Sequence, residues 1–161
     1  MTEFERVLKT LTAGGVEYIL IGGLAANAHG AIRTTRDVDV VYARSRDNLE
    51  RLERTLAPLR PYLRGAPPGL PFHLDVATLE SGLNFTLTTD LGELDLLGEI
   101  AGGGRYEDLL PDAETLDLFG LSCRCLGLDA LIRVKRAAGR PKDFEAIAEL
   151  EALRQERHHS P

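Results

Sequence analysis

Two aspartates one residue apart are the side chains of this chain best suited to chemistry. Asp37 and Asp39 lie in the segment Asp-Val-Asp-Val-Val, residues 37–41, whose valines favour a β-strand. Side chains alternate between the two faces of a strand, so both carboxylates should point the same way. Two like charges held close together cost energy unless a cation lies between them. Oxygen ligands of this kind suit Mg²⁺ bound together with substrate phosphates.

A glycine pair upstream supplies a complementary element for phosphate binding. The segment Tyr18–Ile21 predicts a buried strand, Gly22 and Gly23 predict a turn, and residues 24–29 predict the first turns of a helix. A glycine turn that leads into a helix presents free backbone N–H groups to an anion. A metal-bound triphosphate would therefore satisfy both the glycine turn and the carboxylate pair.

A third carboxylate could come from either of two later segments. Asp95 is flanked by leucines in the second of two predicted strands, residues 83–88 and 93–98, which a short glycine-containing loop joins. Asp75 ends another predicted short strand, residues 71–76, and competes with Asp95 for the same role. We favour Asp95 because its hairpin gives it a central position in a sheet.

In this order, the elements resemble the active-site pattern of the polymerase-β-like nucleotidyltransferase superfamily. The shared pattern is a glycine pair after a strand, thirteen intervening residues, an Asp-Val-Asp on the next strand and a later aspartate between apolar residues. Residues 131–143, LIRVKRAAGRPKD, are also similar to the Lys-and-Arg motif ending in Asp of small bacterial nucleotidyltransferases of the AbiEii-like toxin type. Those toxins belong to abortive-infection and toxin–antitoxin systems. The resemblance covers most of the chain, residues 5–153, and is weakest over residues 60–80.

The resemblance implies a fold, a reaction and a set of site residues. The fold would be α/β (α+β), a polymerase-β-like nucleotidyltransferase core with a mixed twisted sheet of about five to six strands flanked by helices. The reaction would be Mg²⁺-dependent transfer of a nucleoside monophosphate from a nucleoside triphosphate to an acceptor hydroxyl, with room for two ions. The acceptor could be an RNA end such as that of tRNA, a protein or a small molecule. The catalytic and metal-binding residues would be Asp37, Asp39 and Asp95. The nucleotide-binding residues would be Gly22, Gly23, Arg33, Thr35, Lys135, Arg140, Lys142 and Asp143.

Other interpretations of the same residues stay open. A module with this fold could bind a nucleotide, or a toxin or antitoxin partner protein, without turnover. Asp143 could instead stabilise the first turn of the helix that follows it, and Arg33 could be a surface residue. His29, next to Gly30 at a predicted helix end, could cap the last carbonyls rather than act as a base or ligand.

The elements that must position these residues follow from periodicity and turn residues. We expect a helix before the first strand, a helix from Ser45 to residue 57, a hairpin over residues 115–126 and two C-terminal helices separated at Gly139. Residues 60–71 carry four prolines and two glycines, which predicts a loop. A loop of this length could line the acceptor site or move over the nucleotide.

Length and composition favour one globular domain over residues 1–154, followed by a disordered tail over residues 155–161. The chain has 161 residues, of which 43% are hydrophobic, and a net charge of −6 argues against a protein that covers nucleic-acid phosphates. Its only cysteines, Cys123 and Cys125, should be buried strand residues rather than zinc ligands. No apolar stretch approaches the roughly 18 residues of a membrane span, so we expect a cytoplasmic protein without a membrane partner.

Overall fold

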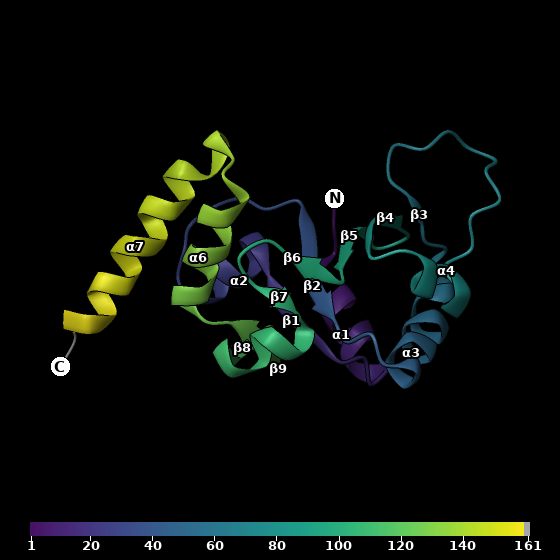
Figure 1. Ribbon diagram of the computed structural model, residues 1–161, viewed down its shortest axis with the longest axis horizontal. Coiled ribbons are helices and arrows are strands. Elements are labelled where there is room, and N and C mark those ends of the chain that lie inside the picture. The colour runs from purple at the N-terminus through teal and green to yellow at the C-terminus, as the bar shows by residue number, and fades with distance from the viewer. Residues whose placement is uncertain (160–161) are drawn as a thin grey trace.

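A seven-stranded mixed sheet forms the centre of the computed structural model, which describes residues 1–159 (Figure 1). The strands, in their order across the sheet, are β3 (Tyr62–Leu63), β4 (Asn84–Thr89), β5 (Gly92–Leu97), β2 (Asp37–Tyr42), β1 (Tyr18–Ile21), β9 (Leu121–Leu126) and β8 (Ala113–Leu118). β2 runs parallel to β5, β1 runs parallel to β9, and the other neighbours are antiparallel. A separate pair, β6 (Glu99–Ile100) and β7 (Gly104–Arg105), forms a two-stranded sheet.

Helices flank the sheet. They are α1 (Phe4–Ala13), α2 (Gly22–Ala28), α3 (Arg46–Leu56), α4 (Val76–Ser81), α5 (Tyr106–Leu109), α6 (Leu128–Ala138) and α7 (Phe144–His159). α2 packs against β1 and β2, α6 packs against α2 and α7, and α1 packs against α3. The α6–α7 pair lies at one end of the molecule and the long loop between β3 and α4 lies at the other (Figure 1). The predicted fold class is therefore confirmed, with seven strands in the main sheet rather than five or six.

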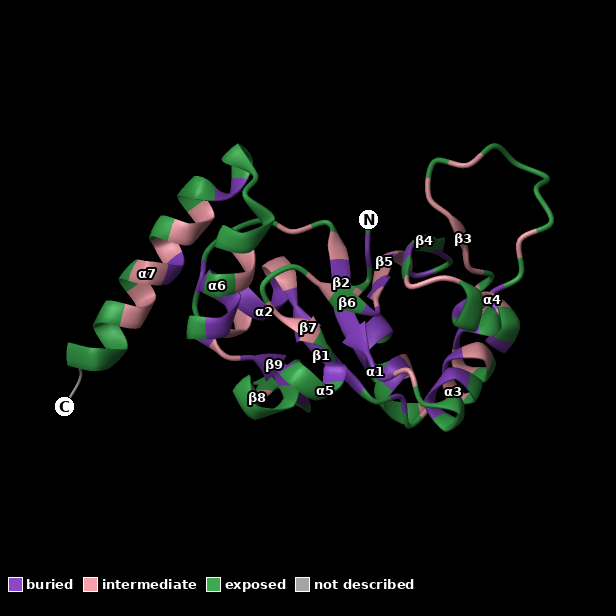
Figure 2. Ribbon diagram, in the orientation of Figure 1, coloured by how far each residue is buried: buried purple, intermediate pink, exposed green. Residues whose placement is uncertain are grey.

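Apolar periodicity decides which faces are buried. On α3, Leu49, Leu52 and Leu56 are buried at helical spacing, and the hydroxyl of Ser45 caps the helix by accepting from the backbone N–H of Asn48. The central strands β1 and β2 are largely buried, whereas α7 and the β3–α4 loop carry mostly intermediate and exposed positions (Figure 2). Cys123 and Cys125 are buried free cysteines, as the sequence predicts. Among residues 1–159, no helix has the length and apolar character needed to cross a membrane.

The register of three strands brings the motifs to one edge of the sheet. β1 ends where β2 and β5 begin, because β1 is antiparallel to β2 and β2 is parallel to β5. Ile21 pairs with Asp39, and Asp39 pairs with Asp95. The turn at Gly22 and the three carboxylates thus meet at this edge.

Two local predictions differ from the structure. Residues 71–76 do not form a strand, because Asp75 caps α4 by accepting a 2.8 Å hydrogen bond from the backbone N–H of Thr78. An aspartate followed by a short helix satisfies the free N–H groups at the helix start, which outweighs weak strand propensity here. α7 extends through His159, beyond residue 154, where we placed the end of the domain, and Arg157 in its last turns contacts His29.

Candidate active site

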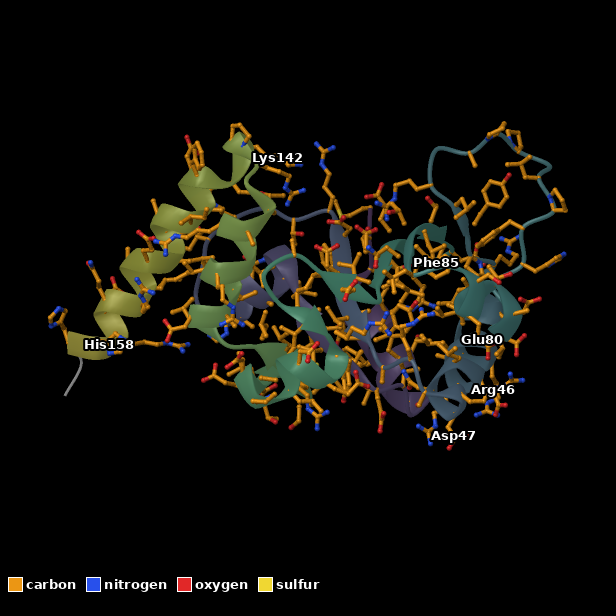
Figure 3. The ribbon with its side chains drawn as sticks, viewed as in Figure 1. Arg46, Asp47, Glu80, Phe85, Lys142 and His158 are labelled. Atoms are coloured by element: carbon orange, nitrogen blue, oxygen red, sulfur yellow. The ribbon has the colours of Figure 1, made fainter. Side chains whose placement is uncertain are left out.

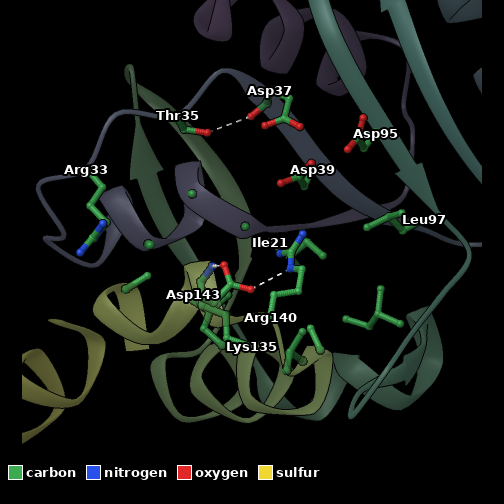
Figure 4. Close-up of a pocket in the computed structure, with 18 of the residues that line it drawn as sticks. Ile21, Arg33, Thr35, Asp37, Asp39, Asp95, Leu97, Lys135, Arg140 and Asp143 are labelled. Atoms are coloured by element: carbon green, nitrogen blue, oxygen red, sulfur yellow. Dashed lines mark hydrogen bonds and ion pairs between the residues drawn. The ribbon is translucent and has the colours of Figure 1, made fainter. Parts of the chain in front are cut away.

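Three carboxylates converge at the edge of the sheet. Asp37 and Asp39 lie on the same face of β2, and Asp95 lies beside Asp39 on the parallel strand β5 (Figure 4). One oxygen from each residue lies within 4.8 Å of the others, and all three side chains are partly buried. Asp75, the alternative third carboxylate, instead caps α4 and is not a member of this group.

Proximity and burial perturb these carboxylates. Burial first, and then the charges of Asp37 and Asp95, raise the pKa of Asp39 from 3.8 to about 8, with Lys135 opposing the shift. Burial also raises the pKa of Asp95. Three carboxylate oxygens form a hard donor set, and a divalent cation among them would offset their repulsion. The residues present therefore fit a divalent metal.

The glycine turn lies directly against this cluster. Gly22 has a φ of +72°, and a Cβ at this position would lie 2.1 Å from Oδ2 of Asp39. A Cβ on Gly23 would lie 2.8 Å from the side chain of Thr35. Glycine is required at both positions because only the absence of a Cβ lets the first turn of α2 approach β2 and the segment before it.

The opposite wall of the site is basic and is organised by a buried aspartate. Asp143 lies in the 3₁₀ turn Pro141–Asp143 between α6 and α7 and is 6% exposed. Its Oδ2 accepts a 2.8 Å hydrogen bond from Nε of Arg140, and its Oδ1 lies 3.8 Å from Nζ of Lys135 (Figure 4). Asp143 therefore positions two basic side chains, a role that neither its predicted nucleotide contact nor the helix-dipole interpretation described.

The remaining predicted nucleotide-binding residues have different surroundings. The guanidinium of Arg33 pairs with Glu149 at 3.1 Å and Glu145 at 3.4 Å, which anchors the segment before β2 on α7. The hydroxyl of Thr35 donates to the carbonyl of Asp37 at 3.3 Å. Lys142 is exposed at the turn between α6 and α7 (Figure 3).

A cavity of about 780 Å³ connects these elements. Its volume lies within the range of ligand pockets, roughly 300 to 1,000 Å³. Every residue that the sequence predicts for the site lines it, from the carboxylates on β2 and β5 to the basic residues of α6 and the turn before α7. Leu97, Glu99 and Ile100 also line the cavity, outside the set of residues predicted for the site.

Two residues outside the predicted set clarify the site. Arg64 is not among the residues that the sequence predicts for the site, yet its Nη2 donates to Oδ1 of Asp95 at 2.8 Å. Its only signal was its place in a loop that could line the acceptor site. His29 is buried, with Nε2 2.9 Å from the carbonyl of Leu126 and Nδ1 2.8 Å from Nη2 of Arg157. It thus has a structural position, although its partner carbonyl lies at the end of β9 rather than in α2.

The fold is that of nucleotidyltransferases. The lincosamide antibiotic adenylyltransferase LnuA, solved with lincomycin, has a similar structure, with a TM-score of 0.63 and 15% sequence identity. The match covers 94% of this chain and 96% of LnuA. ANT(2″)-Ia, solved with adenylyl-2″-tobramycin, gives a TM-score of 0.56 with 18% identity over 94% of this chain and 92% of its own. A Thermotoga maritima protein provisionally assigned as a nucleotidyltransferase gives a TM-score of 0.53 with 16% identity. This match covers 99% of the present chain and 97% of the Thermotoga protein. No protein-family profile matches the sequence, and no curated protein matches it.

Proposed function

We propose that this protein is a Mg²⁺-dependent nucleotidyltransferase that transfers a nucleoside monophosphate from a nucleoside triphosphate to a hydroxyl of a small acceptor molecule. The observation that carries the proposal is that Asp37, Asp39 and Asp95 face the glycine turn and Lys135 within one cavity. LnuA and ANT(2″)-Ia, with lincomycin and adenylyl-2″-tobramycin bound, support a small acceptor. A tRNA or protein acceptor and a toxin–antitoxin role rest on the sequence motif alone.

Each part of the site has a role in this reaction. Asp37, Asp39 and Asp95 would hold one or two Mg²⁺ ions, which supply charge neutralisation to the phosphates when bound. The backbone N–H groups at Gly22 and Gly23 would bind phosphate oxygens of the triphosphate. Lys135, fixed by Asp143, would offset the negative charge that develops on the leaving group.

The bond changes define what a base must do. The acceptor oxygen forms a bond to the α-phosphorus, the bond from that phosphorus to its bridging oxygen breaks, and pyrophosphate leaves. The acceptor hydroxyl must lose its proton, and a carboxylate can accept it only within hydrogen-bond reach. If Asp37 and Asp39 hold the ion without Asp95, Asp95 is the candidate base, because it lies on β5, beside the pair on β2, with a side chain that is 19% exposed.

Labelled nucleotide tests the reaction directly. Each nucleoside triphosphate, labelled at either the α- or the γ-phosphate, is incubated with an aminoglycoside, a lincosamide, tRNA or total protein. Transfer of the α label to a small acceptor, with release of unlabelled pyrophosphate from the same nucleotide, supports the proposal. Transfer of the γ label would identify a phosphotransferase. Transfer of the α label to tRNA or protein would show that the acceptor is a macromolecule rather than a small molecule. No transfer of label to any of these acceptors would favour the interpretation as a binding module.

Nucleotide binding should stabilise the protein in a way that depends on Lys135. A nucleoside triphosphate with Mg²⁺, present at a hundredfold its dissociation constant, should add about 2.7 kcal/mol to the free energy of unfolding. In Lys135→Gln this gain should be smaller at the same nucleotide concentration, because the site loses a positive charge. The side chain of Lys135 is only 17% exposed, so water screens that charge weakly. Thermal unfolding measures both values.

Lys9→Gln is the matched control for this prediction. Lys9 lies on α1, does not line the cavity, and pairs with Glu5 at 3.0 Å with more than half of its side chain exposed. Its loss should leave the nucleotide-induced shift as it is in the wild type. An equal shift in Lys135→Gln and the wild type would remove Lys135 from the binding site.

The affinity for Mg²⁺ should rise with pH. Metal binding requires ionised ligands, and Asp39 has a pKa of about 8 in the metal-free protein. Affinity should therefore increase from about pH 6 to about pH 8 and level off above, with a proton released on binding near neutral pH. Calorimetry in buffers of different ionisation enthalpy measures both quantities. An affinity that does not change across this range would contradict the assignment of Asp39 as a ligand.

A further inference from the structure

Arg64, at the start of the β3–α4 loop, is held beside the carboxylates by β4. Its backbone N–H donates to the carbonyl of Thr86 at 2.9 Å. Its Nη2 donates both to the carbonyl of Leu87 at 2.7 Å and to Oδ1 of Asp95 at 2.8 Å. The two carbonyls of β4 therefore fix the backbone and the guanidinium of Arg64 next to β5.

The guanidinium is shared among several carboxylates rather than paired with one. Nη1 of Arg64 lies 3.9 Å from Oδ2 of Asp37, and Nε lies 3.9 Å from Oε1 of Glu93. Nε is buried and, within the described part of the chain, has no hydrogen-bond acceptor. An arginine that serves one carboxylate usually places two nitrogens on its two oxygens. Arg64 instead spreads its charge over three carboxylates.

An arginine in the same segment shows the contrast. Nε and Nη2 of Arg60 each lie 3.0 Å from an oxygen of Asp90, which is the two-pronged arrangement. The side chain of Arg60 is 81% exposed, whereas that of Arg64 is 24% exposed. Water screens the charge of Arg64 far less, so its electrostatic influence on neighbouring groups is larger.

We propose that Arg64 is a built-in counter-cation of the carboxylate cluster, stabilising it without metal and weakening its affinity for a divalent cation alone. The proposal rests on the proposed function, which places Mg²⁺ at these carboxylates. Because β4 holds the guanidinium in place, an ion at Asp95 shares that carboxylate with a fixed positive charge. A triphosphate brings negative charge that offsets this repulsion. The ion is then retained mainly together with its nucleotide.

The first test measures the stabilising role without metal. Urea unfolding in the presence of a chelator compares wild type, Arg64→Gln, Asp95→Asn and the double variant. Arg64→Gln should lower stability, and the loss should shrink to about half or less in the Asp95→Asn background, because the carboxylate that most closely contacts Arg64 is gone. Arg60→Gln is the matched control, and its loss should be the same in both backgrounds.

The second test measures how strongly Arg64 weakens the binding of Mg²⁺. Mg²⁺ alone, without nucleotide, is titrated against wild type, Arg64→Gln, Arg64→Lys and Arg60→Gln, and the shift in the unfolding midpoint gives the apparent affinity. Arg64→Gln should reach half of its maximal shift at about one third of the wild-type Mg²⁺ concentration or less, because a nearby positive charge is removed. Arg64→Lys keeps the charge and should lie closer to the wild type. Arg60→Gln should match the wild type.

The outcomes separate this inference from the proposed function. If the wild type responds to Mg²⁺ and Arg64→Gln binds it equally or more weakly, Arg64 is not a competing charge and the inference is overturned, whereas the proposed function stands. If neither protein responds to Mg²⁺ and α-labelled nucleotide is not transferred, the proposed function fails. In that case, an unfolding free-energy coupling between Arg64 and Asp95, measured in the presence of chelator, would reflect only a structural ion pair. The inference would then fail as well.

Discussion

Asp39→Asn should abolish nucleotide transfer and, at the same time, stabilise the metal-free protein. Loss of a central metal ligand should lower the transfer rate by about a thousandfold or more, since charge neutralisation at the phosphates is lost. The pKa of Asp39 rises from 3.8 to about 8 on folding, so the folded protein keeps a proton that the unfolded chain releases. The contribution of Asp39 to stability is therefore fully present below about pH 4 and is lost as the pH rises to about 8 and above. Asparagine cannot ionise, so the variant avoids this decline.

Urea unfolding in chelator at two pH values measures the stabilisation. The gain in Asp39→Asn should be on the order of 2 kcal/mol at pH 8 and smaller at pH 5, following the direction of the shift. Asp75→Asn is the matched control, because Asp75 caps α4 outside the cluster and asparagine caps a helix equally well. It should leave both activity and stability near those of the wild type. A destabilised Asp39→Asn protein at pH 8 would contradict the assignment of strained, like-charged carboxylates.

Gly22→Ala should be strongly destabilising and should also disrupt the site. The residue has a φ of +72°, which costs a non-glycine residue about 1 to 2 kcal/mol. The new Cβ would lie 2.1 Å from Oδ2 and 3.0 Å from Cγ of Asp39, so the carboxylate must turn away or β2 and α2 must separate. We expect a total loss of about 3 kcal/mol in the free energy of unfolding, together with a loss of activity of about a hundredfold from displacement of the carboxylate. Chemical denaturation and the labelled-nucleotide assay measure the two effects.

Gly15→Ala separates the backbone cost from the steric contact. Gly15 also has a positive φ, +70°, but its Cβ would meet only Cδ of Arg51, at 3.8 Å. This variant should lose about 1 kcal/mol and keep full activity. Equal losses in stability for the two alanine variants would show that the contact between the new Cβ at position 22 and Asp39 does not contribute to the destabilisation.

Much of the site could be predicted because its determinants are local. The period of a strand places Asp37 and Asp39 on one face whatever surrounds them, and a glycine pair at a strand end predicts a turn. Asp95 could be predicted because its hairpin is closed by a short loop, which fixes its register with β4. The parallel pairing of β5 with β2 then places it beside Asp39.

The remainder depends on contacts between distant segments. Arg64 reaches Asp95 only because the two-residue strand β3 pairs with β4, and so short a strand has no clear pattern in the sequence. Arg33, which could bind nucleotide or be a surface residue, lines the cavity, and its guanidinium pairs with Glu145 and Glu149, more than a hundred residues away. No local pattern in the sequence indicates these pairs. Asp75 shows a competition between local signals, in which capping of α4 outweighs strand propensity.

The pairing of Asp39 with Asp95 limits how the chain can change length. Adding or deleting one residue within β5, or in the tight turn that sets its alignment with β4, would carry Asp95 to the opposite face of the sheet. The stretch between Arg64 and Asp75 carries no such constraint, because it lies outside the main sheet and much of it is exposed. The length of this stretch can therefore change without moving the three carboxylates, whereas a one-residue change in the hairpin displaces Asp95.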